Sequence, residues 1–284
     1  MVELSQDGSA WQLAHGGDTL NTAIHLARAG IATAYLTALG ADPFSERLKT
    51  AWADEGLDTA MVLTDPARSA GLYAIAMDQQ GERSFAYWRS DSAARRLFDC
   101  EGIGPLLEQA ASADLLAFSL ISLAILPPEG RERLLLLARQ ARARGARVAF
   151  DGNYRPRLWE SPAEACAARD AAIACATIGL PTLEDEAALG GSADAAAVAA
   201  HWQGLGCAET VVKLGAQGCR LPDGTILAPP EILTPVDTSG AGDAFNAGYL
   251  AARLHGASCD EAAREGHRLA GWTIMRRGAI PPRD

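Results

Sequence analysis

The sequence reads Val236-Asp237-Thr238-Ser239-Gly240-Ala241-Gly242-Asp243-Ala244-Phe245 near its C-terminal end, and this stretch decides the fold. Its Gly-Ala-Gly segment lets the backbone turn several N–H groups toward one point. A helix is predicted directly after it, over residues 244–254, and a helix N-terminus adds positive potential. We therefore interpret Gly240, Ala241 and Gly242 as an anion hole suited to a phosphoryl group in transfer.

Asp243 lies at the end of this loop, on the first turn of the predicted helix. From there its carboxylate can accept a proton from a hydroxyl poised for attack. Phosphoryl transfer needs this base together with charge stabilisation on the transferred group. The alternative is an ordinary glycine-rich loop with an Asp helix cap. The sequence has neither a Walker P-loop nor the His-Arg-Asp and Asp-Phe-Gly motifs of protein kinases, which excludes those two architectures.

The composition is that of a folded globular protein, with 49% hydrophobic and 21% charged residues among 284. A formal net charge of −10 disfavours nucleic acid and anionic membrane surfaces as partners, because binding to either depends on basic residues. A small anionic substrate stays open, since a few placed arginines can override the overall charge. The longest apolar stretch, 115–126, is shorter than the roughly 20 residues that span a membrane.

The six cysteines are scattered without a Cys-x-x-Cys motif, and the five histidines do not cluster. We therefore predict free thiols in a reducing compartment and no histidine metal site. The sequence opens without the pattern of a signal peptide. These features together predict a cytoplasmic protein.

Strands and helices alternate along most of the chain. The pattern predicts strands over 31–39, 115–120, 147–151, 177–180 and 210–214, and helices over 22–29, 129–144, 162–175 and 244–254. A further helix starts at Asp42-Pro43, with Asp as its cap, and stops near Gly56. This alternation predicts an α/β fold in one domain over 1–284, with a mostly parallel sheet between helices on both faces. Ligands of such sheets bind at the carboxyl ends of the strands.

A β-hairpin is predicted where two apolar runs, 71–77 and 83–88, are joined by Asp78-Gln79-Gln80-Gly81. The hairpin stands apart from the alternation of strands and helices. We therefore predict a small β-lid, with segments near 1–15 and 70–90. An uncovered sheet edge tends to find a partner, so a homo-oligomer through the lid is a further expectation.

A second polar motif, Gly16-Gly17-Asp18-Thr19-Leu20-Asn21, precedes the predicted helix 22–29. The glycines let a substrate approach the backbone, and Asp18 and Asn21 can form hydrogen bonds with sugar hydroxyls. The alternative is a plain loop with a capping Asp.

The two motifs resemble the two characteristic motifs of the ribokinase-like (PfkB) carbohydrate kinases, and the resemblance covers nearly the whole chain. Within that family the chain looks most similar to 2-keto-3-deoxygluconate kinases. The stretches behind this narrower resemblance are 16–23, 71–73, 82–89, 121–124 and 151–159. The resemblance implies a ribokinase-like fold, ATP and Mg²⁺ as cofactors, and phosphorylation of 2-keto-3-deoxygluconate to its 6-phosphate.

The resemblance also implies roles for individual residues. Asp243 is the general base, and the amides of 240–243 form the anion hole. The sugar is held by Gly17, Asp18 and Asn21, by Tyr73, Tyr87 and Arg89 from the lid, and by Ile121 and Arg155 at the far end of the pocket. The nucleotide lies against Lys213, Gly215, Gly218, Gly240 and Gly242. The segments 234–237 and 273–278 flank the adenine and, in some relatives, a monovalent cation such as K⁺.

The chain departs from the family pattern in two places. The family's first strand normally starts several residues earlier, with a Gly-Glu pair, whereas this chain opens at Met1-Val2-Glu3-Leu4, so the first strand is expected to be shortened or to lack its start. The family's Asn-x-x-Glu motif for magnesium is also incomplete. Glu186, in 181–186, best fits its acidic position, and the alternative for 184–186 is a solvated first helical turn.

Arg155 follows the predicted strand 147–151 and is expected to point toward the site, where its planar fork suits a carboxylate. A structural salt bridge is the alternative. Together with Arg89 it places two positive charges far from Asp243, and buried arginines in an acidic protein need an anion nearby. This favours an acid sugar over the rival substrates, the neutral sugars of fructokinases and ribokinases. A catalytically silent sugar sensor on the same scaffold is the rival from another class.

Overall fold

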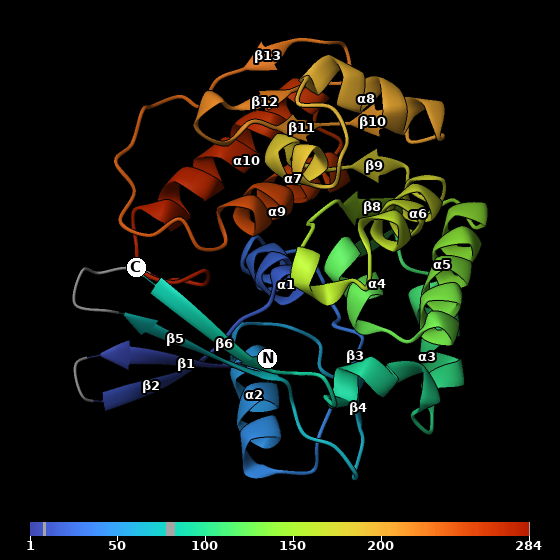
Figure 1. Cartoon of the computed structure of the whole chain (residues 1–284), viewed down its shortest axis with the longest axis vertical. Coiled ribbons are helices and arrows are strands. Elements are labelled where there is room, and N and C mark those ends of the chain that lie inside the picture. Colours follow the sequence, from blue (N-terminus) through green and yellow to red (C-terminus); the bar gives the residue numbers. More distant parts are fainter. Residues whose placement is uncertain (8–9, 78–82, 284) are drawn as a thin grey trace.

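The computed structural model describes residues 1–7, 10–77 and 83–283, and consists of an α/β body with a smaller β-sheet beside it (Figure 1). The body is built on a sheet of order β10-β9-β8-β7, in which every neighbouring pair is parallel. These strands span Leu115–Ser119 (β7), Arg147–Asp151 (β8), Ile178–Gly179 (β9) and Glu209–Thr210 (β10).

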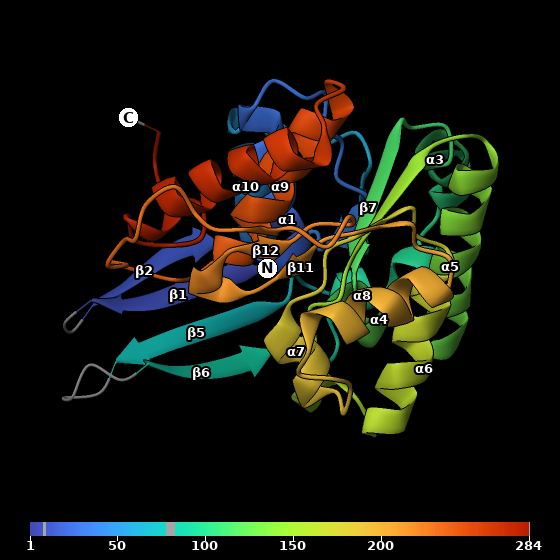
Figure 2. The same cartoon turned by 90° about the horizontal axis from the view of Figure 1, so that it is seen from above.

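Helices cover both faces of this sheet, as the view in Figure 2 shows. One face carries α1 (Asp18–Arg28), α9 (Ala241–Leu254) and α10 (Cys259–Ile274). The other carries α4 (Leu120–Ile125), α5 (Pro128–Ala143), α6 (Pro162–Ile173) and α8 (Ala195–Gly204), and α3 (Ile103–Ala110) packs against α5. The predicted α/β arrangement with helices on both faces is confirmed.

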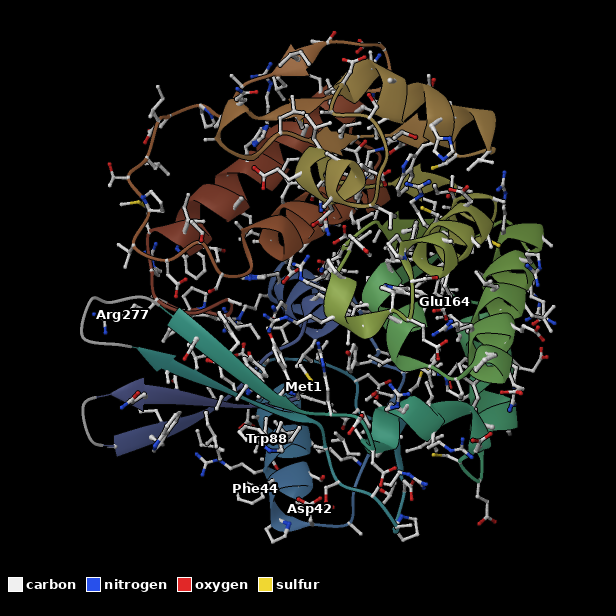
Figure 3. All side chains as sticks on the ribbon, in the orientation of Figure 1. Met1, Asp42, Phe44, Trp88, Glu164 and Arg277 are labelled. Carbon is white, nitrogen blue, oxygen red and sulfur yellow. The ribbon has the colours of Figure 1, made fainter. Side chains whose placement is uncertain are left out.

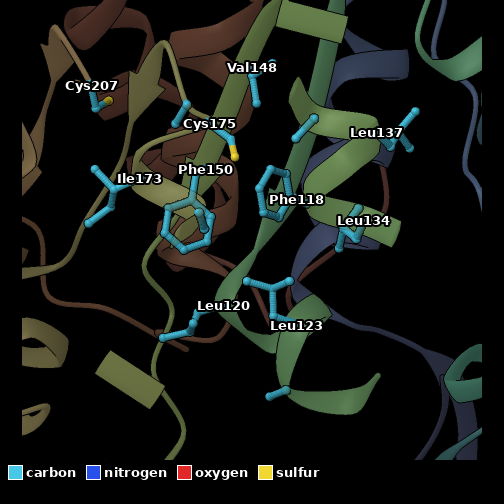
Figure 4. Packing of buried hydrophobic residues seen from close by; sticks show 14 of the residues in the cluster. Phe118, Leu120, Leu123, Leu134, Leu137, Val148, Phe150, Ile173, Cys175 and Cys207 are labelled. Carbon is cyan, nitrogen blue, oxygen red and sulfur yellow. The ribbon is translucent and has the colours of Figure 1, made fainter. Parts of the chain in front are cut away.

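The core lies on the two faces of β8, because side chains alternate along a strand. Val148 and Phe150 point into the cluster with α5 and α6, where Phe150 packs against Phe118 with ring centroids 5.2 Å apart (Figure 4). Ala149, between them, belongs to the second cluster, with Phe245 and Leu250 of α9. Burial of both faces explains why this strand reads as a continuous apolar run.

Helix starts are set by caps. Asp42 accepts hydrogen bonds from the N–H groups of Phe44 and Ser45, both at 3.0 Å, and begins α2 (Pro43–Asp54), which confirms that prediction. Two other helices begin earlier than predicted, α1 at Asp18 and α9 at Ala241, directly after Gly17 and Gly240. Both glycines have positive φ, 147° and 70°, a conformation that glycine adopts without strain. The glycine motifs are therefore the helix starts.

The predicted buried strand 31–39 is wrong over most of its length. Only Thr37–Leu39 (β3) forms a strand, paired in parallel with Val62–Thr64 (β4), and residues 31–36 are exposed or half-buried. The physical reason is that no strand among the described residues pairs with the second edge of β3. An extended segment with one bare edge stays partly exposed.

The predicted strand 210–214 is divided between two sheets. Its first part is β10, and Val212–Lys213 (β11) joins an antiparallel sheet with Cys219–Arg220 (β12) and Ile226–Leu227 (β13). The two short strands β12 and β13 were not predicted. No helix of the described part is long and apolar enough to cross a membrane. All six cysteines are free thiols.

The smaller sheet is the predicted β-lid. Its strands are Val2–Asp7 (β1), Ala10–His15 (β2), Leu72–Met77 (β5) and Arg83–Trp88 (β6), in the order β2-β1-β5-β6. The antiparallel pair β5–β6 confirms the predicted hairpin, whose connection at 78–82 lies outside the described residues. Because β2 is followed directly by Gly16, Gly17 and the start of α1, the lid joins the body at the Gly17-Asp18 motif.

Candidate active site

A cavity of about 1260 Å³ lies between the lid and the carboxyl ends of the body's strands. It brings together most of the residues singled out in the sequence. Those on its wall are Gly17, Asp18, Asn21, Tyr73, Tyr87, Arg89, Ile121, Arg155, Lys213, Gly215, Gly240, Ala241, Gly242 and Asp243. Met1 also lines the cavity and lies near the centre of the molecule, where the lid strands meet the body (Figure 3).

Asp243 lies on the first turn of α9, and its side chain is buried. Asn21 donates a hydrogen bond from Nδ2 to Oδ2 of Asp243 at 2.8 Å, so the two motifs at opposite ends of the chain meet here. Burial, and next the charge of Asp18, raise the pKa of Asp243 from 3.8 to about 7. A carboxyl that titrates near neutral pH is suited to exchanging protons in catalysis.

The loop before Asp243 is shaped by glycine. At Gly240, φ is 70°, and an added Cβ would lie 2.6 Å from Cβ of Ala279. Any other residue there would clash and strain the turn that starts α9. The N–H groups of Gly242 and Asp243 belong to the first helical turn, which lacks intrahelical carbonyl partners, so they remain available to an anion at the cavity.

Asp18 is held from two other elements. Its Oδ2 accepts hydrogen bonds from Oγ of Ser119 at 2.5 Å and from Nδ2 of Asn153 at 3.3 Å. Burial raises the pKa of Asp18. Neither Ser119 nor Asn153 was among the predicted site residues. Ser119 lies near the end of the predicted strand 115–120 and Asn153 follows the predicted strand 147–151, and these positions are the signal that could have found them.

Lys213 belongs to a polar triangle on the opposite wall. Its Nζ donates to Oδ1 of Asp151 and to Oδ1 of Asn246, both at 3.1 Å, and Asn246 donates to Oδ2 of Asp151 at 2.8 Å. The triangle fixes the cation next to the glycine loop, since a Cβ added to Gly242 would lie 3.6 Å from Nζ. Sequence analysis missed Asp151 and Asn246, although Asn246 lies one turn after Asp243.

The lid presents aromatic and charged side chains. Tyr73 donates a hydrogen bond to Oε2 of Glu3 and stacks on Tyr87, with ring centroids 6.1 Å apart. Arg89 places its guanidinium carbon 4.3 Å from the centroid of the Tyr87 ring. Burial, and also the charge of Arg155, lower the pKa of Arg89. Two like charges that oppose each other across a cavity favour an anion between them.

The structure corrects the prediction that Arg155 is a buried arginine without an ion pair. It lines the cavity as predicted, but its side chain is 51% exposed and forms an ion pair with Asp185, Nη1 to Oδ1, at 3.3 Å. The structural salt bridge is therefore present, and the premise of a buried, unpaired arginine fails for Arg155. Arg89 is half-buried, and no ion pair with it is found among residues 1–7, 10–77 and 83–283. Solvent and Asp185 both weaken the attraction of Arg155 for a substrate carboxylate.

Glu186 does not lie at the cavity, which contradicts its expected role as a magnesium ligand. It belongs to α7 (Leu183–Ala188), is 3% exposed and accepts hydrogen bonds from Arg169 Nη1 at 2.8 Å and Trp202 Nε1 at 3.1 Å. Both of its oxygens are thus used inside the core. Its neighbours Glu184 and Asp185 line the cavity instead, because successive helical residues point in different directions.

Gly218 is the other predicted residue that the structure does not bring to the wall. Its N–H donates to the carbonyl of Gly215 at 3.1 Å, and its φ is 101°. An added Cβ would lie 2.0 Å from the carbonyl oxygen of Leu227, so glycine is needed for the turn between β11 and β12. Its contribution to the cavity is to place Gly215.

Asp237 connects the two segments expected beside the adenine, 234–237 and 273–278. Its Oδ1 accepts a hydrogen bond from the N–H of Ser239 at 2.9 Å, and its Oδ2 accepts one from the N–H of Gly278 at 3.0 Å. The N–H of Val236 donates to the carbonyl of Ile274 at 2.8 Å. These contacts hold the start of the glycine loop against the end of α10.

Comparison with known proteins gives a consistent result. Residues 2–284 match the profile of the pfkB family carbohydrate kinases. A 2-dehydro-3-deoxygluconokinase from Escherichia coli (strain K12) is 43% identical over 294 aligned residues, which cover 100% of this chain and 95% of that protein. The solved PfkB protein from Polaromonas sp. JS666 has a TM-score of 0.85 at 28% identity, over 99% of this chain and 94% of the other.

A fructokinase from Vibrio cholerae O395, solved with fructose, ADP and calcium ion bound, has a TM-score of 0.82 at 25% identity, over 98% of this chain and 91% of the other. The predicted ribokinase-like fold is confirmed by these similarities. Since the family profile spans nearly all of the sequence and the glycine loop, base and lid lie around one cavity, the chain belongs to the pfkB family of carbohydrate kinases.

Proposed function

We propose that this protein transfers a phosphoryl group from ATP to the terminal hydroxyl of 2-keto-3-deoxygluconate, giving the 6-phosphate. The observation that carries the proposal is the buried carboxylate of Asp243, on the first turn of α9, which accepts a hydrogen bond from Asn21. This carboxylate faces a cavity that Arg89 of the lid also lines. The E. coli relative at 43% identity is named for this activity. The proposal assigns 1–284 to one kinase domain.

In the proposed reaction, Asp243 accepts the proton of the sugar's terminal hydroxyl as its oxygen attacks the γ-phosphorus of ATP, and ADP leaves. Asn21 orients the carboxylate through its 2.8 Å hydrogen bond. The N-terminus of α9 stabilises the charge of the transferred group. The lid keeps water away from the phosphoryl group.

The cavity fits magnesium as an ion carried by the nucleotide. Within 1–7, 10–77 and 83–283, no group of three or more His, Cys, Asp and Glu residues is placed to hold a metal alone. Mg²⁺ in phosphoryl-transfer sites is held by one or two carboxylates together with phosphates and water. Asp185 and Asp151, which face Lys213, would supply the carboxylates, and Lys213 and Gly242 would contact the phosphates. When bound, the ion neutralises phosphate charge.

The experiment that tests the proposal is to supply the protein with Mg-ATP and 2-keto-3-deoxygluconate. ADP is expected to form only with the sugar present, and phosphorus NMR is expected to show a phosphate ester on the terminal carbon. A K⁺ site beside Asp237 is part of the proposal, so activity is expected to fall when tetramethylammonium replaces K⁺. ADP formation that ignores the sugar would count against the assignment.

A neutral-sugar kinase is the second candidate. The observation in its favour is that Arg155 is exposed and forms an ion pair with Asp185. Of the two arginines expected to bind a carboxylate, only Arg89 is half-buried. The E. coli relative and the repulsion between the two arginines favour the acid sugar. The carboxyl of Asp243 has a pKa of about 7 and lies beside the anion-binding loop, an arrangement that suits proton transfer. A catalytically silent sugar sensor does not need this property.

Glu186→Gln is expected to destabilise the fold without changing the use of magnesium. Removing the charge weakens the hydrogen bond to the buried Arg169 and leaves Asp170 as its remaining carboxylate partner, which costs about 1.5–3 kcal/mol of the free energy of unfolding. Urea unfolding measures this loss, and the Mg²⁺ concentration for half-maximal turnover serves as the second readout. A large rise in that concentration with unchanged stability would restore Glu186 as a metal ligand.

Sugar binding is expected to close the lid. The hairpin strands β5 and β6 carry Tyr73, Tyr87 and Arg89 on the cavity wall and belong to the smaller sheet, outside the parallel sheet of the body. Amide hydrogen exchange in β5 and β6 should therefore slow when the sugar is added. Exchange that stays unchanged at saturating sugar would show that the lid does not move.

We also propose that two copies associate through the lid. Trp11 on the outer strand β2 and Phe85 and Trp88 on the outer strand β6 are exposed, Trp88 by 60%. Sedimentation velocity is expected to give a dimer, and Trp88→Glu is expected to shift it to monomers. A monomeric wild-type protein at micromolar concentration would contradict this.

A further inference from the structure

Arg277, which follows α10, lies on the wall of the active-site cavity and is exposed. It belongs to the segment 273–278 that was expected to flank the adenine, but no role was predicted for it. Figures 1 and 2 both show the end of α10 on the side toward which the lid strands extend, and Figure 3 labels the Arg277 side chain there. The reaction described above gives this arginine no part.

The backbone that follows Arg277 is held by hydrogen bonds. The N–H of Gly278 donates to Oδ2 of Asp237 at 3.0 Å, and the carbonyl oxygen of Ala279 lies 3.1 Å from Nε2 of His25. The guanidinium of Arg277 is therefore carried by a fixed piece of backbone. Binding of a ligand orders its side chain only, which keeps the entropic cost of binding small.

The segment that carries Arg277 packs against the glycine loop. A Cβ added to Gly240 would lie 2.6 Å from Cβ of Ala279, two residues after Arg277. Asp237, which accepts a hydrogen bond from this segment, also accepts one from the N–H of Ser239, at the start of the loop. Arg277 and the loop line the same cavity. An anion bound by the loop therefore lies on the wall that carries this guanidinium.

The charges on the cavity wall make each basic side chain important. Among the described residues, the wall carries eight Asp and Glu residues but only four Lys and Arg residues. The proposed reaction brings a nucleoside triphosphate and a sugar acid into this acidic cavity, and both are anions. Like charges repel more strongly in a cavity of low dielectric than in water. The basic residues therefore decide where the anions bind.

Arg277 differs from the other three basic residues in having no partner. The other three contacts are the ion pairs Lys213–Asp151 and Arg155–Asp185 and the position of Arg89 over the ring of Tyr87. Within 1–7, 10–77 and 83–283, no ion pair, hydrogen bond or ring contact involves the side chain of Arg277. An anion can bind this guanidinium without breaking an existing contact.

The position of Arg277 favours a phosphate over the sugar carboxylate. Arg89 and Arg155 are expected at the acid end of the sugar, whereas Arg277 adjoins the loop that leads into Asp243, where the phosphoryl group is transferred. A guanidinium presents a planar fork of N–H donors that fits two phosphate oxygens. An arginine that stabilises the transferred group is a recurring part of phosphoryl-transfer sites.

We infer that the guanidinium of Arg277 binds the γ-phosphate of ATP beside the glycine loop. During transfer, the sugar oxygen bonds to the γ-phosphorus, the bond from that phosphorus to ADP breaks, and the hydroxyl proton passes to Asp243. Arg277 donates hydrogen bonds to the γ-phosphate oxygens and offsets their negative charge. The inference rests on the proposed use of ATP, and it holds for an acid or a neutral sugar.

Titration with nucleotide alone tests this contact. The probes are the magnesium complexes of β,γ-imido-ATP, which keeps a γ-phosphate, and of ADP, which lacks one. Arg277→Gln is expected to raise the Kd of the imido analogue by about 10- to 150-fold, the effect of one charge-assisted hydrogen bond, and to leave the Kd of ADP nearly unchanged. Arg277→Lys, which keeps the charge but not the planar fork, is expected to give an intermediate Kd.

Arg276→Gln is the matched control. Arg276 is the preceding residue, its guanidinium carbon lies 4.4 Å from the centroid of the Trp272 ring, and it is not among the described residues that line the cavity. This variant is expected to bind both nucleotides as the wild type does. The unfolding temperature of Arg277→Gln is expected to equal that of the wild type, because the exposed side chain makes no contact that holds the fold.

Two results would overturn the inference. Equal weakening of both nucleotides by Arg277→Gln would place the arginine at the ADP part of the nucleotide. Unchanged binding of the imido analogue would show that the arginine stays in solvent. Because the titration needs no sugar, its result is separate from the substrate assignment. A protein that prefers a neutral sugar but loses the imido analogue in Arg277→Gln would contradict that assignment and support this inference.

Discussion

Asp243→Asn is expected to lower kcat for 2-keto-3-deoxygluconate by roughly 100-fold or more, the scale of losing a general base. The amide keeps the shape of the carboxyl and its contact with Asn21, but it cannot accept the proton. ATP binding is expected to stay nearly unchanged, because the anion loop at 240–242 is intact. An ADP-release assay gives kcat and titration gives the Kd of ATP. Turnover near that of the wild type would remove Asp243 from the mechanism.

The pH profile provides a second readout of Asp243. As a base it acts when deprotonated, and its pKa is raised to about 7, mainly by burial. The value of kcat/KM in the wild type is therefore expected to fall about tenfold per pH unit below pH 7. The residual activity of Asp243→Asn is expected to lack this limb. A wild-type profile that stays flat down to pH 5 would contradict the assignment.

The raised pKa of Asp243 also affects the stability of the fold. Its effect is opposite in sign to that of a carboxylate whose pKa is lowered by folding. The folded-state pKa lies above the ordinary value of 3.8, so the folded protein holds this proton more tightly than the unfolded chain. The charge of Asp243 thus destabilises the fold above pH 7, and this cost disappears as the pH falls toward 4. Asp243→Asn should raise the unfolding temperature at pH 8, with a smaller gain at pH 5.5.

Arg89→Gln is expected to raise KM for 2-keto-3-deoxygluconate by about 10- to 150-fold, while KM for fructose changes little. A hydrogen bond to a charged group contributes about 1.5–3 kcal/mol, and Arg89 is half-buried on the cavity wall. Steady-state kinetics with both sugars measures the difference. An equal loss with both would show that Arg89 supports the lid and does not read the acid.

Arg155→Ala is the matched variant, since this arginine lines the same cavity but is 51% exposed and paired with Asp185. Exposed pairs are worth about 0.2–1 kcal/mol, so a change in KM of less than about fivefold is expected. If Arg155→Ala had the larger effect, the acid would lie nearer Arg155 than Arg89.

The fold and most residues of the site can be predicted from the sequence, because glycines, helix caps and the residues that follow strands are recognisable from their immediate sequence neighbours. Gly240 and Asp243 could be read from the turn that precedes a helix, and Asp42 from its cap. The position of Arg155 after β8 predicts its place at the cavity, yet its exposure and its partner Asp185 depend on another element, α7. Contacts of that kind have no local signature.

The errors share one cause, which is that burial depends on distant neighbours. The segment 31–39 has the composition of a buried strand, but its burial needs a strand at each edge, and β3 has one. Glu186 was chosen over Asp185 by its place in the motif, whereas Arg169 and Trp202 draw it into the core. The polar triangle of Lys213, Asp151 and Asn246 joins three elements and appears only in three dimensions.

The most direct test of the account is kcat/KM of the wild-type protein with Mg-ATP for 2-keto-3-deoxygluconate, fructose and ribose under one set of conditions. The account predicts the highest value for the acid sugar, by about tenfold or more over either neutral sugar, with the phosphate on the terminal carbon. A preference for fructose or ribose would contradict the assignment of Arg89 as the residue that reads a carboxylate and would make the protein a neutral-sugar kinase.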